Sequence, residues 1–232
     1  MSQHRVLLFG ATGALGSAIS ETFSSHGWRV FSIVRERVDL EDEILLPLDT
    51  SPDFSAALAE KNFDSIVFAQ GANFNGTVLT TTDEDFQRIF EANVTFVIQQ
   101  VKFLMEKNAI AMKGKIVILS SLAEVFTRKE KLAYTVSKAA VGGLVRSLAV
   151  DLGRSHGILV NGVLPGVVDT PMSRKNLTSD QIANVLDATP IGALVTPTDV
   201  ANTVYLLGSA LNTGVSGQSL LVDNAFSVTF LP

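Results

Sequence analysis

The sequence predicts a doubly wound α/β fold, in which a parallel sheet carries helices on both faces. Three observations carry the prediction: short apolar runs alternate with longer amphipathic segments, most of the runs are hydrophobic on both faces, and a glycine-rich turn follows the first run. Runs that are apolar at every position are typical of parallel strands covered on both sides. Strand–helix alternation implies crossover connections between parallel strands.

Seven segments are expected to be strands because they are short, apolar and β-branched. They are residues 6–9, 29–34, 44–48, 65–69, 115–120, 158–164 and 219–222. Helices are expected over residues 14–25, closed by His26-Gly27, over residues 83–107, and around Tyr134 and Lys138. No linker or low-complexity run divides the chain, so residues 1–232 are expected to form one domain.

Composition excludes several function classes. The net charge is −5 with no basic tract, which argues against a nucleic-acid or anionic-membrane partner. The chain has no cysteine, which excludes disulfides and cysteine catalysis and fits a reducing compartment. The histidines have no metal-ligand spacing. There is no signal-peptide pattern and no apolar stretch of about 20 residues, so we expect a cytoplasmic protein without a membrane span.

A tyrosine and a lysine, Tyr134 and Lys138, lie four residues apart in a helical pattern. That spacing places both side chains on one helix face. A phenol has an unperturbed pKa of about 10. A nearby cation favours phenolate and would bring the proton within reach of exchange. The pair alone is weak evidence, because the same spacing recurs by chance on solvated helix faces.

A glycine-rich turn follows the first predicted strand and contains Gly10, Gly13 and Gly16. Glycines allow a tight turn and a close backbone approach, and the following helix offers free N–H groups to a pyrophosphate. A turn of this kind can also be purely structural. Its place at the first strand–helix junction favours dinucleotide binding.

The end of the second predicted strand indicates which dinucleotide is used. Arg35 follows Val34, where an acidic residue would bind a free ribose 2′-hydroxyl. A guanidinium suits a 2′-phosphate and can stack on adenine, so NADP is favoured. Glu36 keeps NAD possible, and Arg35 could instead be a solvated surface charge.

These motifs occur in the order of a known family, and the chain resembles the short-chain dehydrogenase/reductases nearly from end to end. The resemblance implies a Rossmann-type, seven-stranded parallel sheet. It rests on the glycine turn, the strand end Ile118-Leu119-Ser120-Ser121, Tyr134-x-x-x-Lys138, and the segment from Asn161 to Met172, followed by residues 190–202 and 214–223.

The resemblance implies four catalytic residues. Tyr134 would be the general acid/base, and Lys138 would lower its pKa and bind the nicotinamide ribose. Ser121 would orient the substrate, with Ser120 the less favoured neighbour. Asn93 would hold a water in a proton relay. Without the resemblance, Ser121 could simply cap a turn and Asn93 could bridge backbone groups inside a helix.

The resemblance also implies cofactor contacts beyond the glycine turn. Pro165 could instead only shape its turn, and Asp49 could only cap a helix. The remaining expected contacts are Thr12, Leu15, Asp49, Thr50, Ala69, Gln70, Gly71, Pro165, Val168 and Thr170, together with Tyr134 and Lys138.

Some positions depart from the family's pattern. Ala14 replaces a glycine of the turn, Ala69-Gln70-Gly71 follows the fourth strand where the family often has Asn-Ala-Gly, and Asn224 follows Asp223 where a glycine is usual. The segment at about 171–195 is short, which implies a small substrate lid. It does not identify the substrate.

Together these features predict an NADP(H)-dependent oxidoreductase that interconverts a carbonyl, of the ketone or 3-oxoacyl type, and a secondary alcohol. An alternative is a cofactor-binding regulatory or scaffold protein without turnover. A sugar-nucleotide epimerase is a third possibility, which the short C-terminal part disfavours. Apolar residues on several faces of residues 93–105 and 139–152 favour a homo-oligomer, a dimer or tetramer, although these helices could merely cover the sheet.

Overall fold

The computed structural model describes residues 3–35, 39–40, 42–45 and 62–229. Within them, seven parallel strands form one sheet in the order β3-β2-β1-β4-β5-β6-β7. The order reverses between β1 and β4, which confirms the doubly wound topology. The strands are β1 (Arg5–Phe9), β2 (Arg29–Val34), β3 (Glu43–Leu45), β4 (Phe63–Phe68), β5 (Ile110–Leu119), β6 (Leu159–Pro165) and β7 (Ser219–Val222).

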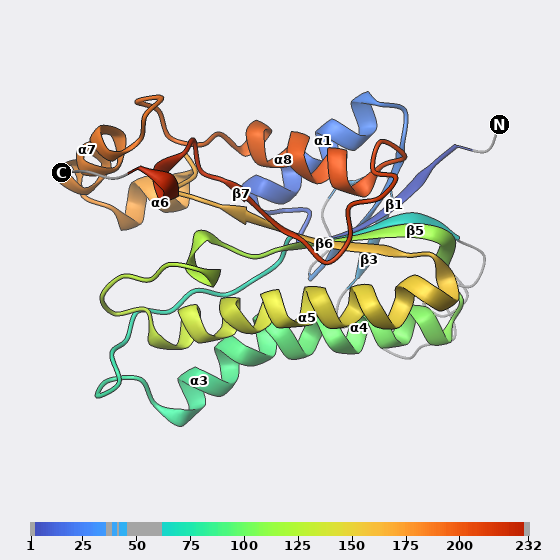
Figure 1. The fold of residues 1–232 in the computed structure, drawn as a ribbon, viewed down its shortest axis with the longest axis horizontal. Helices are drawn as coiled ribbons and strands as arrows, with labels where there is room; N and C mark the ends of the chain where they lie inside the picture. Colours follow the sequence, from blue (N-terminus) through green and yellow to red (C-terminus); the bar gives the residue numbers. More distant parts are fainter. Residues whose placement is uncertain (1–2, 36–38, 41, 46–61, 230–232) are drawn as a thin grey trace.

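Helices cover both faces of the sheet (Figure 1). One face carries α1 (Ala14–Ser25) and α8 (Pro197–Gly208), which pack against each other. The opposite face carries α3 (Asp83–Phe90), α4 (Phe96–Glu106) and α5 (Leu132–His156). Two shorter helices, α6 (Pro171–Asn176) and α7 (Ser179–Ala188), lie beyond the end of β6.

Each face of the sheet buries its own hydrophobic cluster. Phe9 and Phe68 stack at 4.6 Å between ring centroids in the cluster under α4 and α5. Phe23 on α1 packs edge-to-face with Trp28 in the cluster under α1 and α8. Burying one such side chain fully stabilises a fold by roughly 1.5–3 kcal/mol. The two clusters explain why most of the predicted strands read as apolar on both faces.

Several strand ends differ from the sequence prediction by one or two residues, and two differences are larger. β5 begins at Ile110, five residues before the predicted start, because Ile110 pairs with Phe63 across a register shift in β4. The predicted helix over residues 83–107 contains a π-helical turn, η1 (Glu91–Thr95), in which the Phe96 N–H bonds Glu91 O. This wider turn holds Asn93, whose side chain bonds groups outside its own helix. π-Turns of this kind often accompany functional sites.

Candidate active site

The carboxyl ends of the central strands bring most of the predicted site residues to one edge of the sheet. Loops leave β1 at Gly10, β4 at Ala69 and β5 at Ser120, and α6 and α7 lie beyond β6 at the same edge (Figure 1). This edge includes the point between β1 and β4 where the strand order reverses. Ligands of doubly wound sheets bind at such points.

The three glycines of the first turn have different reasons to be glycine. Gly10 has φ of +80°, and a side chain there would meet the Gln70 backbone N at 2.7 Å. A Cβ on Gly16 would overlap the Gly10 carbonyl oxygen. A Cβ on Gly13 would make only an ordinary 3.6 Å contact with that oxygen. The fold therefore requires Gly10 and Gly16, whereas Gly13 is free to serve a ligand.

The start of α1 suits a phosphate group. Gly13 is the N-cap, no side chain caps the helix, and the first turn has no acidic residue. The first N–H groups of a helix and its dipole attract anions. Thr12 is exposed beside this turn, whereas Leu15 is half-buried and also packs against the hydrophobic cluster under α1 and α8.

The loop after β4 passes directly beside the catalytic candidates. A Cβ on Gly71 would lie 3.1 Å from Asn93 Oδ1 and 3.6 Å from Lys138 Nζ. Half-buried Ala69 and Gln70 precede it, and Gln70 Oε1 is buried with no hydrogen-bond partner among the described residues. An orphaned buried acceptor is costly unless a ligand or water satisfies it.

Asn93 connects this loop to α5. Its Oδ1 accepts a bond of 2.8 Å from the Ala72 N–H, and its Nδ2 donates to Ala72 O at 3.0 Å and to Ser137 Oγ at 2.9 Å. Ser137 Oγ in turn donates to Tyr134 O at 2.8 Å. Asn93 therefore does not bridge backbone groups inside its own helix; it links the loop after β4 to Ser137 on α5, and Ser137 continues the link to Tyr134 O.

Lys138 is buried, with 4% of its surface exposed, and its Nζ donates to Leu119 O at 3.0 Å. Burial lowers the pKa of this amine to about 8, although the nearby Glu124 carboxylate opposes the shift. The Nζ lies 5.9 Å from the centroid of the Tyr134 ring. The predicted juxtaposition of phenol and ammonium is thus present, with the amine anchored to the end of β5.

Tyr134 differs from the sequence prediction in the direction of its pKa. Burial raises the pKa of the phenol, and the neighbouring Ser121 hydroxyl opposes that shift. We expected Lys138 to lower this pKa, but Lys138 is not among the groups that shift it, and removal from water dominates because burial penalises phenolate. The phenol is therefore protonated at neutral pH.

Ser121, rather than Ser120, lies against the Tyr134 phenol. Ser121 Oγ also accepts the Ala123 N–H at 3.1 Å and caps the short helix η2 (Leu122–Glu124), so the turn-capping interpretation holds as well. Ser120 is buried, and its N–H donates to Val163 O at 2.8 Å. Its hydroxyl is 3.5 Å from Lys138 O, which is a weak contact.

The segment that follows β6 lies at the same edge of the sheet. Pro165 ends β6, Val168 pairs with Val195 in an isolated bridge, and Thr170 caps α6 by accepting the Ser173 N–H. These contacts give Pro165 and Thr170 structural tasks as well. The expected lid contains α6 and α7. Two of its apolar side chains are exposed: Met172 on α6 and Ile191 in the loop after α7.

The adenosine end of the predicted site is described only in part. Arg35 is exposed directly after β2. Asp49, Thr50 and Glu36 lie outside the described residues.

Sequence reasoning missed two residues near Tyr134. Ser137 is fully buried and joins Asn93 to α5. Its position between Ala133 and Val141, four residues from each, could have placed it on the buried helix face. Lys131 is also buried, and its Nζ lies 5.3 Å from the centroid of the Tyr134 ring. No local pattern distinguishes it from exposed Lys129.

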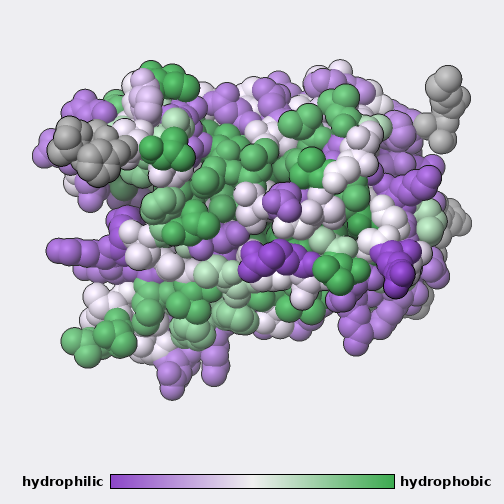
Figure 2. Space-filling view, viewed as in Figure 1, coloured by the Kyte–Doolittle hydropathy of each residue, from purple (hydrophilic) through white to green (hydrophobic). Residues whose placement is uncertain are grey.

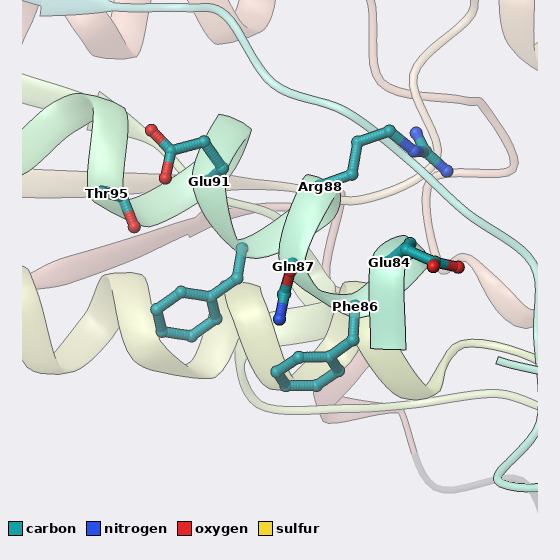
Figure 3. A pocket seen from close by; sticks show the side chains of 7 residues that line it. Glu84, Phe86, Gln87, Arg88, Glu91 and Thr95 are labelled. Carbon is teal, nitrogen blue, oxygen red and sulfur yellow. The ribbon is translucent and has the colours of Figure 1, made fainter. Parts of the chain in front are cut away.

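One groove lies apart from these residues. It has a volume of about 590 Å³ and is lined along α3 and η1, with Phe86, Arg88 and Glu91 among its walls (Figure 3). Glu91 and Thr95 belong to the same π-turn as Asn93, but none of the predicted catalytic residues lines the groove. Across the described residues, no group of three or more His, Asp or Glu side chains could hold a metal ion.

Known proteins resemble this chain over most of its length. The family described as "Enoyl-(Acyl carrier protein) reductase" matches residues 53–227. The chain is 27% identical to 3-oxoacyl-[acyl-carrier-protein] reductase FabG of Escherichia coli (strain K12), covering 94% of each chain. It is 30% identical to 2-(R)-hydroxypropyl-CoM dehydrogenase of Xanthobacter autotrophicus (strain ATCC BAA-1158 / Py2), over 90% of this chain and 84% of that protein.

A solved structure agrees. An oxidoreductase of the short-chain dehydrogenase/reductase family from Burkholderia thailandensis superposes with a TM-score of 0.86 and 26% identity, over 99% of this chain and 94% of that one. The chain belongs to the short-chain dehydrogenase/reductase family. As a member it is an oxidoreductase of CH–OH and C=O groups that uses a nicotinamide cofactor. The alternative of a scaffold without turnover is therefore set aside.

The residues fit such a cofactor. Gly13 makes no contact that requires a glycine. Among the residues that the structure describes, no side chain caps the N–H groups that start α1, and Gln70 Oε1 has no hydrogen-bond partner. Within the described residues no helix is both long and apolar enough to cross a bilayer.

Proposed function

We propose that this short-chain dehydrogenase/reductase reduces a ketone or 3-oxoacyl carbonyl to a secondary alcohol with NADPH, and that Tyr134 is the general acid. The observation that carries the proposal is the position of the Tyr134 phenol, which lies beside the Ser121 hydroxyl and has Lys138 Nζ 5.9 Å from its ring centroid. A half-buried phenol that stays protonated at neutral pH is suited to donating its proton. The resemblance to a 3-oxoacyl reductase supports the 3-oxoacyl class.

The chemistry divides between cofactor and protein. The bound cofactor supplies the hydride, and the chain supplies orientation and a proton. Ser121 and Tyr134 would donate hydrogen bonds to the carbonyl oxygen, where negative charge develops. The Tyr134 proton would then pass to that oxygen. Lys138, as a cation beside the ring, would stabilise the phenolate left behind.

The proton must be replaced after each turnover. We propose that Lys138, which would also bind the nicotinamide ribose, and a water held near Asn93 return it from solvent. The support is that Asn93 Oδ1 and Lys138 Nζ lie 3.1 Å and 3.6 Å from one point, the position of a Cβ on Gly71. A bonded path also runs from Asn93 through Ser137 to the backbone oxygen of Tyr134. That path fixes the position of the π-turn η1 relative to α5.

We propose NADP rather than NAD, with Arg35 binding the 2′-phosphate. Arg35 is exposed immediately after β2, beside β1 and the glycine turn in the sheet. A guanidinium binds phosphate through paired N–H donors. Of the other expected contacts, the N–H groups around Thr12 and Gly13 would bind the pyrophosphate, and the segment from Pro165 to Thr170 would bind the carboxamide.

We also propose a homo-oligomer, a dimer or tetramer, in the cytoplasm. Hydrophobic surface gathers over the edge strand β7 (Figure 2), where Leu220 is 43% exposed. Along α5, Val136 and Val150 are exposed as well. Exposed sheet edges and apolar helix faces are surfaces that a second copy can cover. Light scattering would measure the assembly, and a monomer at micromolar concentration would contradict it.

One assay tests the function. Purified protein is mixed with NADPH or NADH and a series of ketones, 3-oxoacyl thioesters and oxo acids, and the absorbance of the reduced cofactor is followed. We expect NADPH oxidation with some of these carbonyls and slower oxidation with NADH. Binding of NADPH without turnover of any carbonyl would contradict the proposed reductase activity.

A further inference from the structure

A second amine lies beside the reacting phenol, and the reaction described above does not use it. Lys131 is the N-cap residue of α5, three residues before Tyr134, and only 7% of its surface is exposed. Its Nζ is 5.3 Å from the centroid of the Tyr134 ring. Lysines are almost never this buried without a partner of opposite charge.

Lys131 has no such partner within the described parts of the chain. Its Nζ donates to Asn73 Oδ1 at 2.6 Å, which is a neutral acceptor, and no carboxylate lies within ion-pair distance. An ammonium has three donors, so two remain without an acceptor there. Arg128 lies near enough to act on the amine as a second positive charge.

Apart from the Tyr134 ring, over which the amine lies, the surroundings do not favour a cation for stability. The N-terminus of a helix is the positive end of its dipole, so an ammonium at the start of α5 is repelled. Burial and Arg128 together lower the pKa of Lys131 to about 8, which still leaves it charged at neutral pH. An unneutralised charge kept in such a position costs stability, and an arriving anion would recover that cost.

The backbone holds this amine in place. Gly76 and Lys131 form an isolated parallel bridge, with the Gly76 N–H bonding Glu130 O at 2.9 Å and the Leu132 N–H bonding Gly76 O at 3.2 Å. The bridge joins the loop that carries Asn73 to the start of α5. The loop after β4 therefore holds Lys131 in place through Gly76 and Asn73, and it also bonds Asn93 through Ala72.

We propose that Lys131, assisted by Arg128, binds a carboxylate of the substrate, so that the natural substrate is an oxo acid or the corresponding hydroxy acid. The inference rests on the proposed carbonyl reduction at Tyr134. The amine belongs to the N-cap residue of α5 and the phenol to the first turn of that helix, and Lys131 Nζ is 5.3 Å from the centroid of the Tyr134 ring. The carboxylate and the reacting carbonyl would therefore be only a few carbons apart.

Matched substrates test the proposal. Pyruvate, acetoacetate and levulinate place the two groups at increasing separation, and the methyl ester of each removes the charge. For at least one pair we expect wild-type kcat/KM to favour the acid by about tenfold or more, as for hydrogen bonds to charged groups. Lys131→Met should reduce that acid-to-ester ratio about tenfold or more, and Lys131→Arg should retain part of it.

Lys129→Met is the matched control, because it removes the same charge from an exposed side chain two residues away. It should keep the wild-type ratio. Lys131→Gln serves as a second variant if Lys131→Met does not fold. The proposal is overturned if the wild type prefers every ester, or if Lys129→Met and Lys131→Met change the ratio equally.

A binding measurement separates this proposal from the reductase activity. If no carbonyl is turned over, butyrate and butyramide are titrated into the NADPH-loaded protein and followed by ligand-observed NMR. Binding of butyrate alone, lost in Lys131→Met but kept in Lys129→Met, would support the carboxylate site without the reaction. Equal binding of butyrate to all three proteins, or binding to none, would overturn it.

Discussion

Asn93 Nδ2 donates a hydrogen bond of 2.9 Å to Ser137 Oγ, which joins the π-turn η1 to α5, the helix that carries Tyr134 and Lys138. Both residues are buried, and Ser137 passes the connection to Tyr134 O. The two side chains should therefore act as one unit. A double-mutant cycle of Asn93→Ala and Ser137→Ala, measured by urea unfolding, should give a coupling energy of about 1 kcal/mol.

Additive effects of the two substitutions would contradict this link. The second readout of the cycle is turnover. Because each change loosens the position of Tyr134, both single variants should lower kcat more than they raise the KM for NADPH. A pure loss of stability with unchanged kcat would mean that the bond is structural only.

Removing the Tyr134 hydroxyl should abolish most turnover. General acid catalysis contributes about 10²–10⁴-fold, so Tyr134→Phe should lower kcat by that order. The affinity for NADPH, measured by fluorescence, should stay within about twofold, since the ring remains in place. Tyr205→Phe is the control, because Tyr205 packs against Phe23 and His26 on the other face of the sheet. Equal activity losses in the two variants would contradict the assignment.

The glycine turn offers a matched pair of substitutions. In Gly16→Ala the new methyl group would overlap Gly10 O, so we expect a large loss of stability, several kcal/mol on the scale of overpacked or strained sites. In Gly13→Ala the contact is ordinary, and stability should change by less than about 1 kcal/mol.

The same pair tests the phosphate site. Gly13→Ala should bind NADPH at least about tenfold more weakly while remaining folded, because its methyl group lies where the backbone would approach the pyrophosphate. Thermal unfolding and fluorescence titration measure the two properties separately. Unchanged NADPH affinity in Gly13→Ala would remove the argument that this glycine serves a ligand.

Sequence reasoning predicted the sheet because its strands are buried on both faces, a local property of residues such as Ile66 and Val67. It could not predict the π-turn, because the turn presents Asn93 to partners that are distant in the sequence. Asn93 bonds Ala72 and Ser137, and Ser137 is 44 residues away. The catalytic candidates were predicted because the motifs of this chain have the order and spacing of the short-chain dehydrogenase/reductase family. Lys131 was missed because only tertiary packing distinguishes it from exposed Lys129.

The buried amine of Lys138 should appear in the pH dependence of stability. Burial lowers its pKa to about 8 in the folded protein, from 10.5 when exposed. Between these values the unfolded chain binds more protons, so this group makes the free energy of unfolding rise with pH. The stability of the wild type relative to Lys138→Met, without cofactor, should increase by about 2 kcal/mol from about pH 7 to pH 10.

Lys131 shifts in the same direction but is present in both proteins, so its contribution cancels in the difference. Urea unfolding at several pH values provides the measurement. A difference that stays flat, or falls with pH, would show that Lys138 is not held in a water-poor environment.

Arg35 should determine the choice between the two dinucleotides. A guanidinium that binds the 2′-phosphate contributes about 1.5–3 kcal/mol, or about 10–100-fold in affinity. Arg35→Ala should therefore raise the KM for NADPH by that factor and change the KM for NADH by less than about twofold. Arg146→Ala, which removes the same charge from an exposed site on α5, is the control. An equal effect of Arg35→Ala on both cofactors would overturn the NADP assignment, because the 2′-phosphate is the group by which the two differ.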